Sequence, residues 1–114
     1  MIQIKRVYEA ADRGDGQRFL VDRLWPRRIK RSALSLDGWN KEVAPSTELR
    51  QWFNHDPDRW NEFHGRYFAE LARKPEAWEP LAEIQRQGTV TLLYGAKDME
   101  HNHAIVLMTF LRSR

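Results

Sequence analysis

The sequence predicts a single small α/β domain over residues 1–114, with a short, mostly parallel sheet packed with about four helices in a three-layer-like arrangement. Two strand patterns lie near the N-terminus, and a third, Thr89–Tyr94, follows three helical patterns. This third segment has β-branched and aromatic residues and no charge, which is typical of a strand covered on both faces. A last helical pattern follows it, so the predicted order is β-β-α-α-α-β-α.

The composition excludes several classes of protein. The chain has no cysteine, which excludes disulfide scaffolds, thiolate zinc sites and cysteine catalysis. No apolar run approaches the roughly 20 residues that span a bilayer, so no membrane partner is predicted. Charge by the fifth residue leaves no apolar signal-peptide core, and we expect a soluble bacterial cytoplasmic protein.

The first two strands are predicted at residues 2–8 and 18–23. Ile2, Ile4 and Val7 alternate with polar residues in the first, and two glycines with two aspartates mark a turn over 11–16. The gap between the strands is shorter than the dozen or so residues that a parallel crossover needs. We therefore expect these strands to be antiparallel or not directly paired.

Residues 24–45 form a long segment without a regular pattern. Apolar residues at intervals, among them Leu34, Leu36, Trp39 and Val43, are expected to pack it onto the core. A structureless loop of this length in a small domain is usually functional, or it contains a short element that the pattern does not reveal.

Four helices are predicted in the rest of the chain. Ser46 is the N-cap of the first, and Asp56 with Pro57 begins the second, which ends at Lys74–Pro75. The third covers 76–87, where Pro80 is expected to delay its start or kink it. The fourth covers 102–113. The apolar stripe of the second helix, Trp60, Phe63, Tyr67 and Leu71, is assigned to the core.

The stretch from Leu20 to Arg27 carries the features of a site. An apolar strand runs into Asp22, Arg23, Trp25 and Arg27, and Pro26 prevents the backbone from continuing as strand. A stiff, charged loop at the carboxyl end of a strand is where α/β proteins usually bind ligands.

Three long motifs in order give the chain a family resemblance. Val21–Arg27, Ala44–Arg50, and Thr91–Asp98 together with Asn102–Ala104 resemble the YeaO-like proteins of domain-of-unknown-function family 488. The resemblance runs essentially end to end, and it implies a small bacterial α/β protein without an established activity. Family members commonly have glycine where this chain has Arg28. Arg28 adds a side chain and a charge beside the expected site, so the backbone there need not follow the family's geometry.

A ligand site is expected where the loops after residues 18–23 and 89–94 meet. If those strands are parallel neighbours, both loops open at the same carboxyl edge, and the last helix directs its N-terminus there. The candidate ligand-binding residues are Asp22, Arg23, Trp25, Arg27, Tyr94, Lys97 and Asn102. Asp98 and His103 are the candidates for acid–base chemistry, although the residues leave open whether any reaction is catalysed.

Simpler interpretations of the same residues stand beside this one. Asp22 and Arg23 would pair with Lys97 and Asp98 in a purely structural lattice, and Trp25 would be packed rather than stacked on a ligand. A phosphate-binding glycine-rich loop is absent, which argues against ATP hydrolysis of that type. His101 and His103 are two residues apart and do not share a helix face, so no metal site and no cofactor are predicted.

Two functions follow from the cations. The first is binding, at the carboxyl edge, of a small anionic ligand that bears phosphate or carboxylate, a class that includes nucleotide-like molecules. The alternative is a nucleic-acid-binding module that uses the basic stretch 23–31, in which five of nine residues are Lys or Arg, with Trp25 to stack on a base. Convergence of Arg23, Arg27 and Lys97 in a pocket would favour the small anion.

Overall fold

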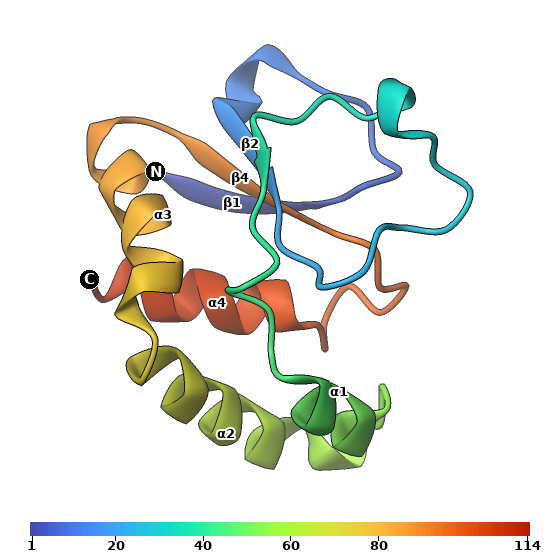
Figure 1. Ribbon diagram of the computed structural model, residues 1–114, viewed down its shortest axis with the longest axis vertical. Coiled ribbons are helices and arrows are strands. Elements are labelled where there is room, and N and C mark those ends of the chain that lie inside the picture. Colours follow the sequence, from blue (N-terminus) through green and yellow to red (C-terminus); the bar gives the residue numbers. More distant parts are fainter.

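The sheet consists of four parallel strands in the order β1-β4-β2-β3, in a computed structural model that describes all 114 residues (Figure 1). The strands are β1 (Ile2–Arg6), β2 (Gln17–Leu20), β3 (Gly38–Trp39) and β4 (Val90–Tyr94). The α/β prediction is confirmed. β4 separates β1 from β2. Of the two alternatives for the first two strands, the one in which they are not directly paired is therefore confirmed, and the antiparallel one does not occur.

The irregular segment contains one strand that sequence patterns did not reveal. β3 pairs with β2 through Phe19 opposite Gly38 and Leu20 opposite Trp39. A two-residue strand is too short to show alternation, so the pattern gave no signal. The second predicted strand is shorter than expected, because regular pairing ends at Leu20, although the N–H of Val21 still donates to the carbonyl of Leu93.

The four helices are α1 (Thr47–Phe53), α2 (Trp60–Ala72), α3 (Pro75–Gln87) and α4 (His103–Arg112). Ser46 is the N-cap of α1, as predicted, and its Oγ accepts the N–H of Leu49 at 3.1 Å. Asp56 caps a 3₁₀ turn over Pro57–Arg59 that leads into α2. Pro80 lies inside α3 and does not delay its start. No helix combines the length and the hydropathy that crossing a membrane requires.

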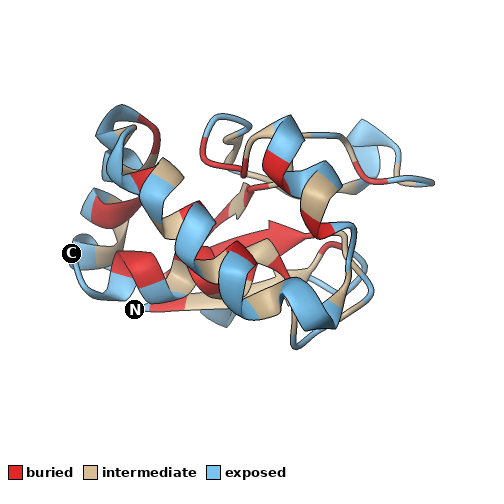
Figure 2. Cartoon of the chain, turned by 90° about the horizontal axis from the view of Figure 1, so that it is seen from below, coloured by how far each residue is buried: buried red, intermediate tan, exposed pale blue.

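Two hydrophobic clusters cover the two faces of the sheet. The larger one lies between the sheet and the helices, where α4 packs on β1 and β4 and α2 packs on α4. In Figure 2, buried residues gather on the central strand and on the helix sides that face it. On the other face Val7, Leu20 and Leu93 are covered by part of the irregular segment, through Trp25, Ile29, Leu34, Leu36 and Trp39. The third layer of the fold is therefore an irregular segment rather than a helix.

Candidate functional site at the carboxyl edge of the sheet

The loops after β2 and β4 open at the same edge of the sheet, as predicted, because these strands are parallel neighbours. Figure 1 shows the loop after β1, the loop after β2 and the 95–101 loop gathered on the right-hand side. We call this side the carboxyl edge. The predicted residues on it occupy three different environments: they hold the loops together, lie buried beneath them, or project into solvent.

Asp22 fastens the two loops together. Its Oδ2 accepts the N–H of Gly95 at 2.9 Å, and its Oδ1 lies 3.2 Å from Nε2 of His103. A Cβ at position 95 would lie 3.1 Å from Asp22 Oδ2, so glycine allows this close approach. Asp22 therefore sets the position of the 95–101 loop and of the first turn of α4 relative to β2.

His103 has one ring nitrogen directed at two acceptors. Its Nε2 lies 3.0 Å from the carbonyl oxygen of Val21 as well as beside the Asp22 carboxylate. Because neither oxygen can donate, the hydrogen-bond network assigns the proton to Nε2. The hydrogen bond is made to the Val21 carbonyl, and the buried Oδ1 of Asp22 has no hydrogen-bond partner. Asp22 and His103 are separated by most of the chain, so the sequence indicated each residue but not their contact.

Asp98 belongs to a separate turn and does not contact His103. Its Oδ1 accepts the N–H groups of Glu100 and His101, and its Oδ2 lies 3.0 Å from Nδ1 of His101. The Glu100 N–H, with further help from His101, lowers the pKa of Asp98 below its ordinary value. A carboxyl group with a lowered pKa is ionised at neutral pH, so it is a poor proton donor there.

Arg23 points away from Arg27 and Lys97. Its Nη2 donates to the carbonyl of Ala44 at 3.2 Å and its Nε to that of Pro45 at 3.3 Å. Nζ of Lys74 donates to the same Ala44 carbonyl at 2.9 Å. Arg23 therefore holds the segment before α1 in place, and none of the hollows described below is lined by Arg23, Arg27 or Lys97. Neither Asp22 nor Arg23 pairs with Lys97 or Asp98.

Tyr94 and Asn102 lie beneath the edge. Both are 2% exposed, and burial raises the pKa of the Tyr94 phenol. Asn102 Oδ1 accepts the N–H of Ile105 at 3.0 Å and so caps α4, while its Nδ2 donates to the carbonyl of Asp98 at 3.0 Å. These two side chains support the loop from below and are closed to solvent.

Trp25 is packed, as the simpler interpretation held. Its Nε1 donates to the carbonyl of Ile29 at 2.7 Å, and its ring lies edge-on to Trp39 with 5.3 Å between centroids. The guanidinium of Arg31 lies 4.8 Å from the Trp25 ring centroid. Trp25 therefore anchors the irregular segment on the sheet.

Arg27 and Lys97 are exposed, and neither forms an ion pair. Arg6, at the end of β1, and Tyr8, just after it, bond the segments that carry Lys97 and Arg27. The Tyr8 hydroxyl donates to the Arg27 carbonyl at 3.1 Å, and Arg6 Nε donates to the Ala96 carbonyl at 2.9 Å. The Arg6 guanidinium also lies 4.9 Å from the Tyr8 ring centroid. Arg6 and Tyr8 were not predicted as site residues, because their contribution depends on β1 lying parallel to β4.

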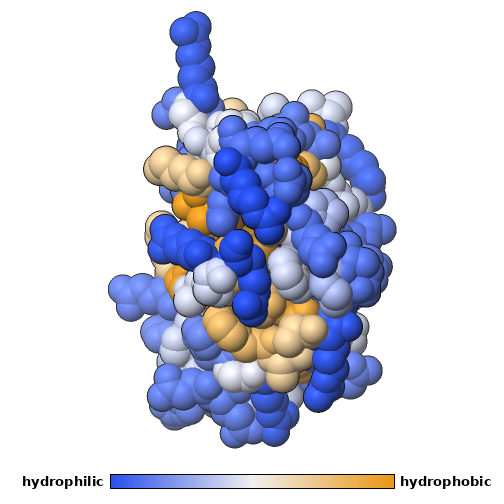
Figure 3. All heavy atoms as spheres, turned by 90° about the vertical axis from the view of Figure 1, so that its left-hand side faces the viewer, coloured by the Kyte–Doolittle hydropathy of each residue, from blue (hydrophilic) through white to orange (hydrophobic).

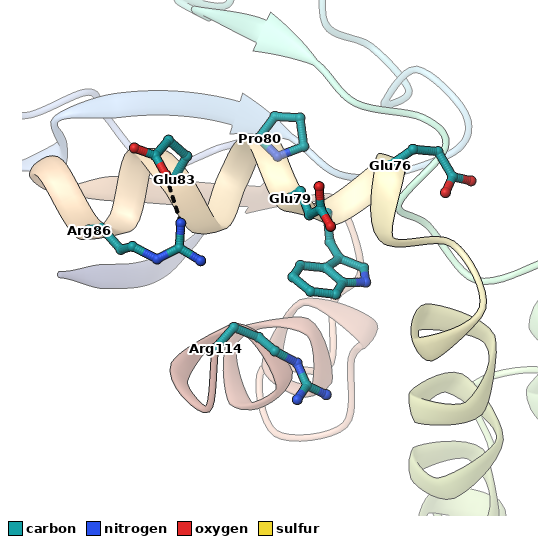
Figure 4. A pocket seen from close by; sticks show the side chains of 7 residues that line it. Glu76, Glu79, Pro80, Glu83, Arg86 and Arg114 are labelled. Atoms are coloured by element: carbon teal, nitrogen blue, oxygen red, sulfur yellow. Dashed lines mark hydrogen bonds and ion pairs between the residues drawn. The ribbon is translucent and has the colours of Figure 1, made fainter.

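Three hollows of the surface lie outside the two loops that carry Arg27 and Lys97. One of about 730 Å³ is bounded by α3 and the C-terminus. Its lining includes Glu76, Glu79, Glu83, Arg86 and Arg114, and Glu83 pairs with Arg86 (Figure 4). Figure 3 shows the side of the molecule on the left of Figure 1, where hydrophilic side chains project between smaller apolar patches. Others of about 540 and 390 Å³ lie between α1 and α2 and beside β3. No group of three or more histidine, aspartate or glutamate side chains is arranged to hold a metal ion.

The parallel sheet, with helices on one face and an irregular layer on the other, defines a small single-sheet α/β protein whose strands direct their loops to one edge. Residues 1–114 match the family described as "Inactive DUF488-N3 subclade", and the chain belongs to that family. The resemblance to family 488 in the three motifs is thereby confirmed.

The relatives are bacterial proteins whose names describe them as uncharacterised. The chain is 50% identical to the uncharacterised protein YeaO of Escherichia coli over 112 residues, which cover 98% of this chain and 97% of YeaO. It is 40% identical to uncharacterised proteins of Mycobacterium tuberculosis and Mycobacterium bovis over 113 residues, which cover 99% of this chain and 95% of each relative. No solved structure matches the chain.

Proposed function

We propose that this protein binds a small ligand bearing phosphate or carboxylate at the carboxyl edge, through Arg27 and Lys97. The observation that carries the proposal is that two exposed cations without carboxylate partners lie on neighbouring loops. Tyr8 and Arg6 join these loops to the end of β1 and limit their separation. Exposed cations without partners suit an anion, and the bonds from Tyr8 and Arg6 limit the loop entropy that is lost when it binds.

The remaining residues of the edge support binding rather than catalysis. Asp22 bonds Gly95 of the 95–101 loop, His103 bonds the Val21 carbonyl, and Tyr94 and Asn102 lie buried beneath the edge. Asp98 is poorly suited to donate a proton at neutral pH. The description of the family as inactive agrees with a binding role.

The test is an NMR titration of the protein with inorganic phosphate, ribose 5-phosphate, AMP and citrate. We expect one of these anions to shift the backbone amides of Arg27 and Lys97. Arg27→Ala and Lys97→Ala should each weaken binding about five- to tenfold, with little change in stability, because both side chains are exposed.

Arg13→Ala is the matched control, since Arg13 is an exposed arginine on the turn before β2, at the opposite end of that strand. It should bind like the wild type. If Arg27→Ala, Lys97→Ala and Arg13→Ala all lose the same anion affinity, net charge explains the effect. If Arg27→Ala and Lys97→Ala bind as the wild type does, the anion site does not lie at the carboxyl edge.

A second function, nucleic-acid binding by the basic stretch, is favoured by a separate observation. Arg27, Arg28, Lys30 and Arg31 are all exposed and form no ion pair. Oligonucleotide affinity that falls steeply with added salt, and that drops in an Arg28→Gln, Lys30→Gln double variant, would support this function instead.

A further inference from the structure

The hollow beside β3 has aromatic walls. It measures about 390 Å³ and is bounded by β3 and the residues around it, and we call it the aromatic hollow. Its lining residues are Phe19, Gly38, Trp39, Asn40, Lys41 and Glu42. The hollow is open to solvent, and its two aromatic rings lie beside the polar side chains of Asn40, Lys41 and Glu42.

The two rings of the aromatic hollow are fixed by their neighbours. Trp39 Nε1 donates to the carbonyl of Asp22 at 2.7 Å, and the indole packs edge-on against Trp25. The Phe19 ring lies against the backbone of Gly38, where a Cβ would come within 2.7 Å of Phe19 Cε1. Glycine at position 38 therefore lets the Phe19 ring lie close to the backbone of β3. A ring that is already ordered loses little entropy when a planar ligand stacks on it.

Two cations without carboxylate partners lie over the Trp39 indole. Nζ of Lys41 lies 4.2 Å from the Trp39 ring centroid, and the Arg31 guanidinium lies 5.0 Å from it. Neither side chain forms an ion pair. Glu42 is the only carboxylate in the lining. The ring thus combines a π-face with mobile positive charge, which is the chemistry that recognises a base carrying a phosphate.

Asp22 links the aromatic hollow to the edge that carries Arg27 and Lys97. Its backbone carbonyl receives the Trp39 indole N–H, while its carboxylate receives the N–H of Gly95. One rigid residue therefore lies between the indole and the 95–101 loop.

We propose that the aromatic hollow binds the base of a nucleotide, which stacks on Trp39 and displaces the Lys41 ammonium toward the phosphate. This inference rests on the proposed function, because it names a nucleotide as the phosphate-bearing ligand. A free nucleotide and a nucleotide within a single strand share this chemistry, so the experiment includes both.

The experiment follows the five tryptophan indole N–H signals in ¹H–¹⁵N spectra, with Trp39 assigned by its absence in Trp39→Phe. The probes are AMP, ribose 5-phosphate and oligo(dA). AMP is expected to shift the Trp39 signal, and ribose 5-phosphate, which has no base, to leave it in place. Lys41→Gln should weaken AMP binding about fivefold or more, whereas Arg13→Gln, an equal loss of charge on the turn before β2, should not weaken it.

Each outcome separates the two proposals. Amide shifts of Arg27 and Lys97 with both small phosphates, without a Trp39 shift, would overturn the aromatic hollow and leave the edge site standing. A Trp39 shift that depends on Lys41 but not on Arg27 or Lys97 would support the aromatic hollow and remove the edge site. A Trp39 response to oligo(dA) but not to AMP would assign the aromatic hollow to single strands. No Trp39 response to either probe would refute it.

Discussion

Arg28 holds a backbone conformation that side chains rarely adopt. Its φ is 65°, in the left-handed region, where a Cβ costs about 1–2 kcal/mol. Glycine adopts this φ without that cost. The loop therefore has, at Arg28, a backbone conformation that glycine favours, and this chain carries the strain together with a charged side chain.

Replacing Arg28 by glycine should stabilise the protein. We expect Arg28→Gly to raise the free energy of unfolding by about 0.5–1 kcal/mol, because relief of strain exceeds the entropy that glycine adds to the unfolded chain. Arg27→Gly is the matched control. Arg27 does not have a positive φ, so this variant should lose stability. Urea denaturation measures both, and a loss of stability in Arg28→Gly would contradict the argument.

Single residues also show how far the sequence predicts the site. The aspartate, arginine, tryptophan and lysine of the two loops were recognised because charged and aromatic residues followed apolar strands. Where each side chain points was not predictable. The direction of Arg23 depends on the carbonyls of Ala44 and Pro45, and the environment of Trp25 depends on Ile29 and Trp39. These contacts are set by tertiary packing, which has no pattern along the chain.

At the scale of elements, α4 and the loop before it are joined by one buried side chain. Asn102 caps the helix with its oxygen and holds the Asp98 carbonyl with its nitrogen. The helices were predictable from their caps and apolar stripes, because those signals are local. β3 was not predictable, since its two residues form a strand only through pairing with β2.

Two substitutions separate the roles of Asn102. Asn102→Ala removes both bonds and should cost about 2 kcal/mol, from a lost N-cap and an unpaired buried carbonyl. Asn102→Asp retains the capping oxygen but loses the donor to Asp98, so we expect altered 95–101 amides with α4 intact. Thermal unfolding and amide NMR measure these effects. Equal loss of helix signals in both variants would show that the bond to the Asp98 carbonyl, and not the cap, holds α4.

At the scale of the whole molecule, Asp15 joins several parts of the sheet. Its carboxylate lies 2.8 Å from Nζ of Lys5 on β1 and also pairs with Arg18 on β2. Its backbone carbonyl accepts the hydroxyl of Thr91 on β4 at 2.7 Å. Burial alone would raise the pKa of Asp15, but Lys5, the Asp12 N–H and Arg18 outweigh it and hold the pKa below its ordinary value.

This arrangement predicts acid sensitivity. A carboxyl group with a lowered pKa in the folded state stabilises the fold above its unfolded pKa of about 4 and loses that contribution as the pH falls through the folded value. Asp15→Asn should therefore be less stable than the wild type at pH 7, and the difference should shrink below about pH 4. Urea denaturation at a series of pH values measures the difference. A difference that stayed constant down to pH 2 would show that Asp15 does not carry the effect.

The strand order has a consequence for how the protein is made. The strand at the centre of the sheet, β4, comes from the last quarter of the chain, and β1 pairs with nothing else. During synthesis β1 therefore cannot pair until Val90–Tyr94 has been made. The apolar side chains of β1 and β2 stay uncovered until nearly the whole chain has left the ribosome. Contacts so distant in sequence slow folding, and meanwhile hydrophobic surface is exposed that can aggregate with other chains. A nascent chain that stops before residue 90 lacks the strand around which the sheet is built.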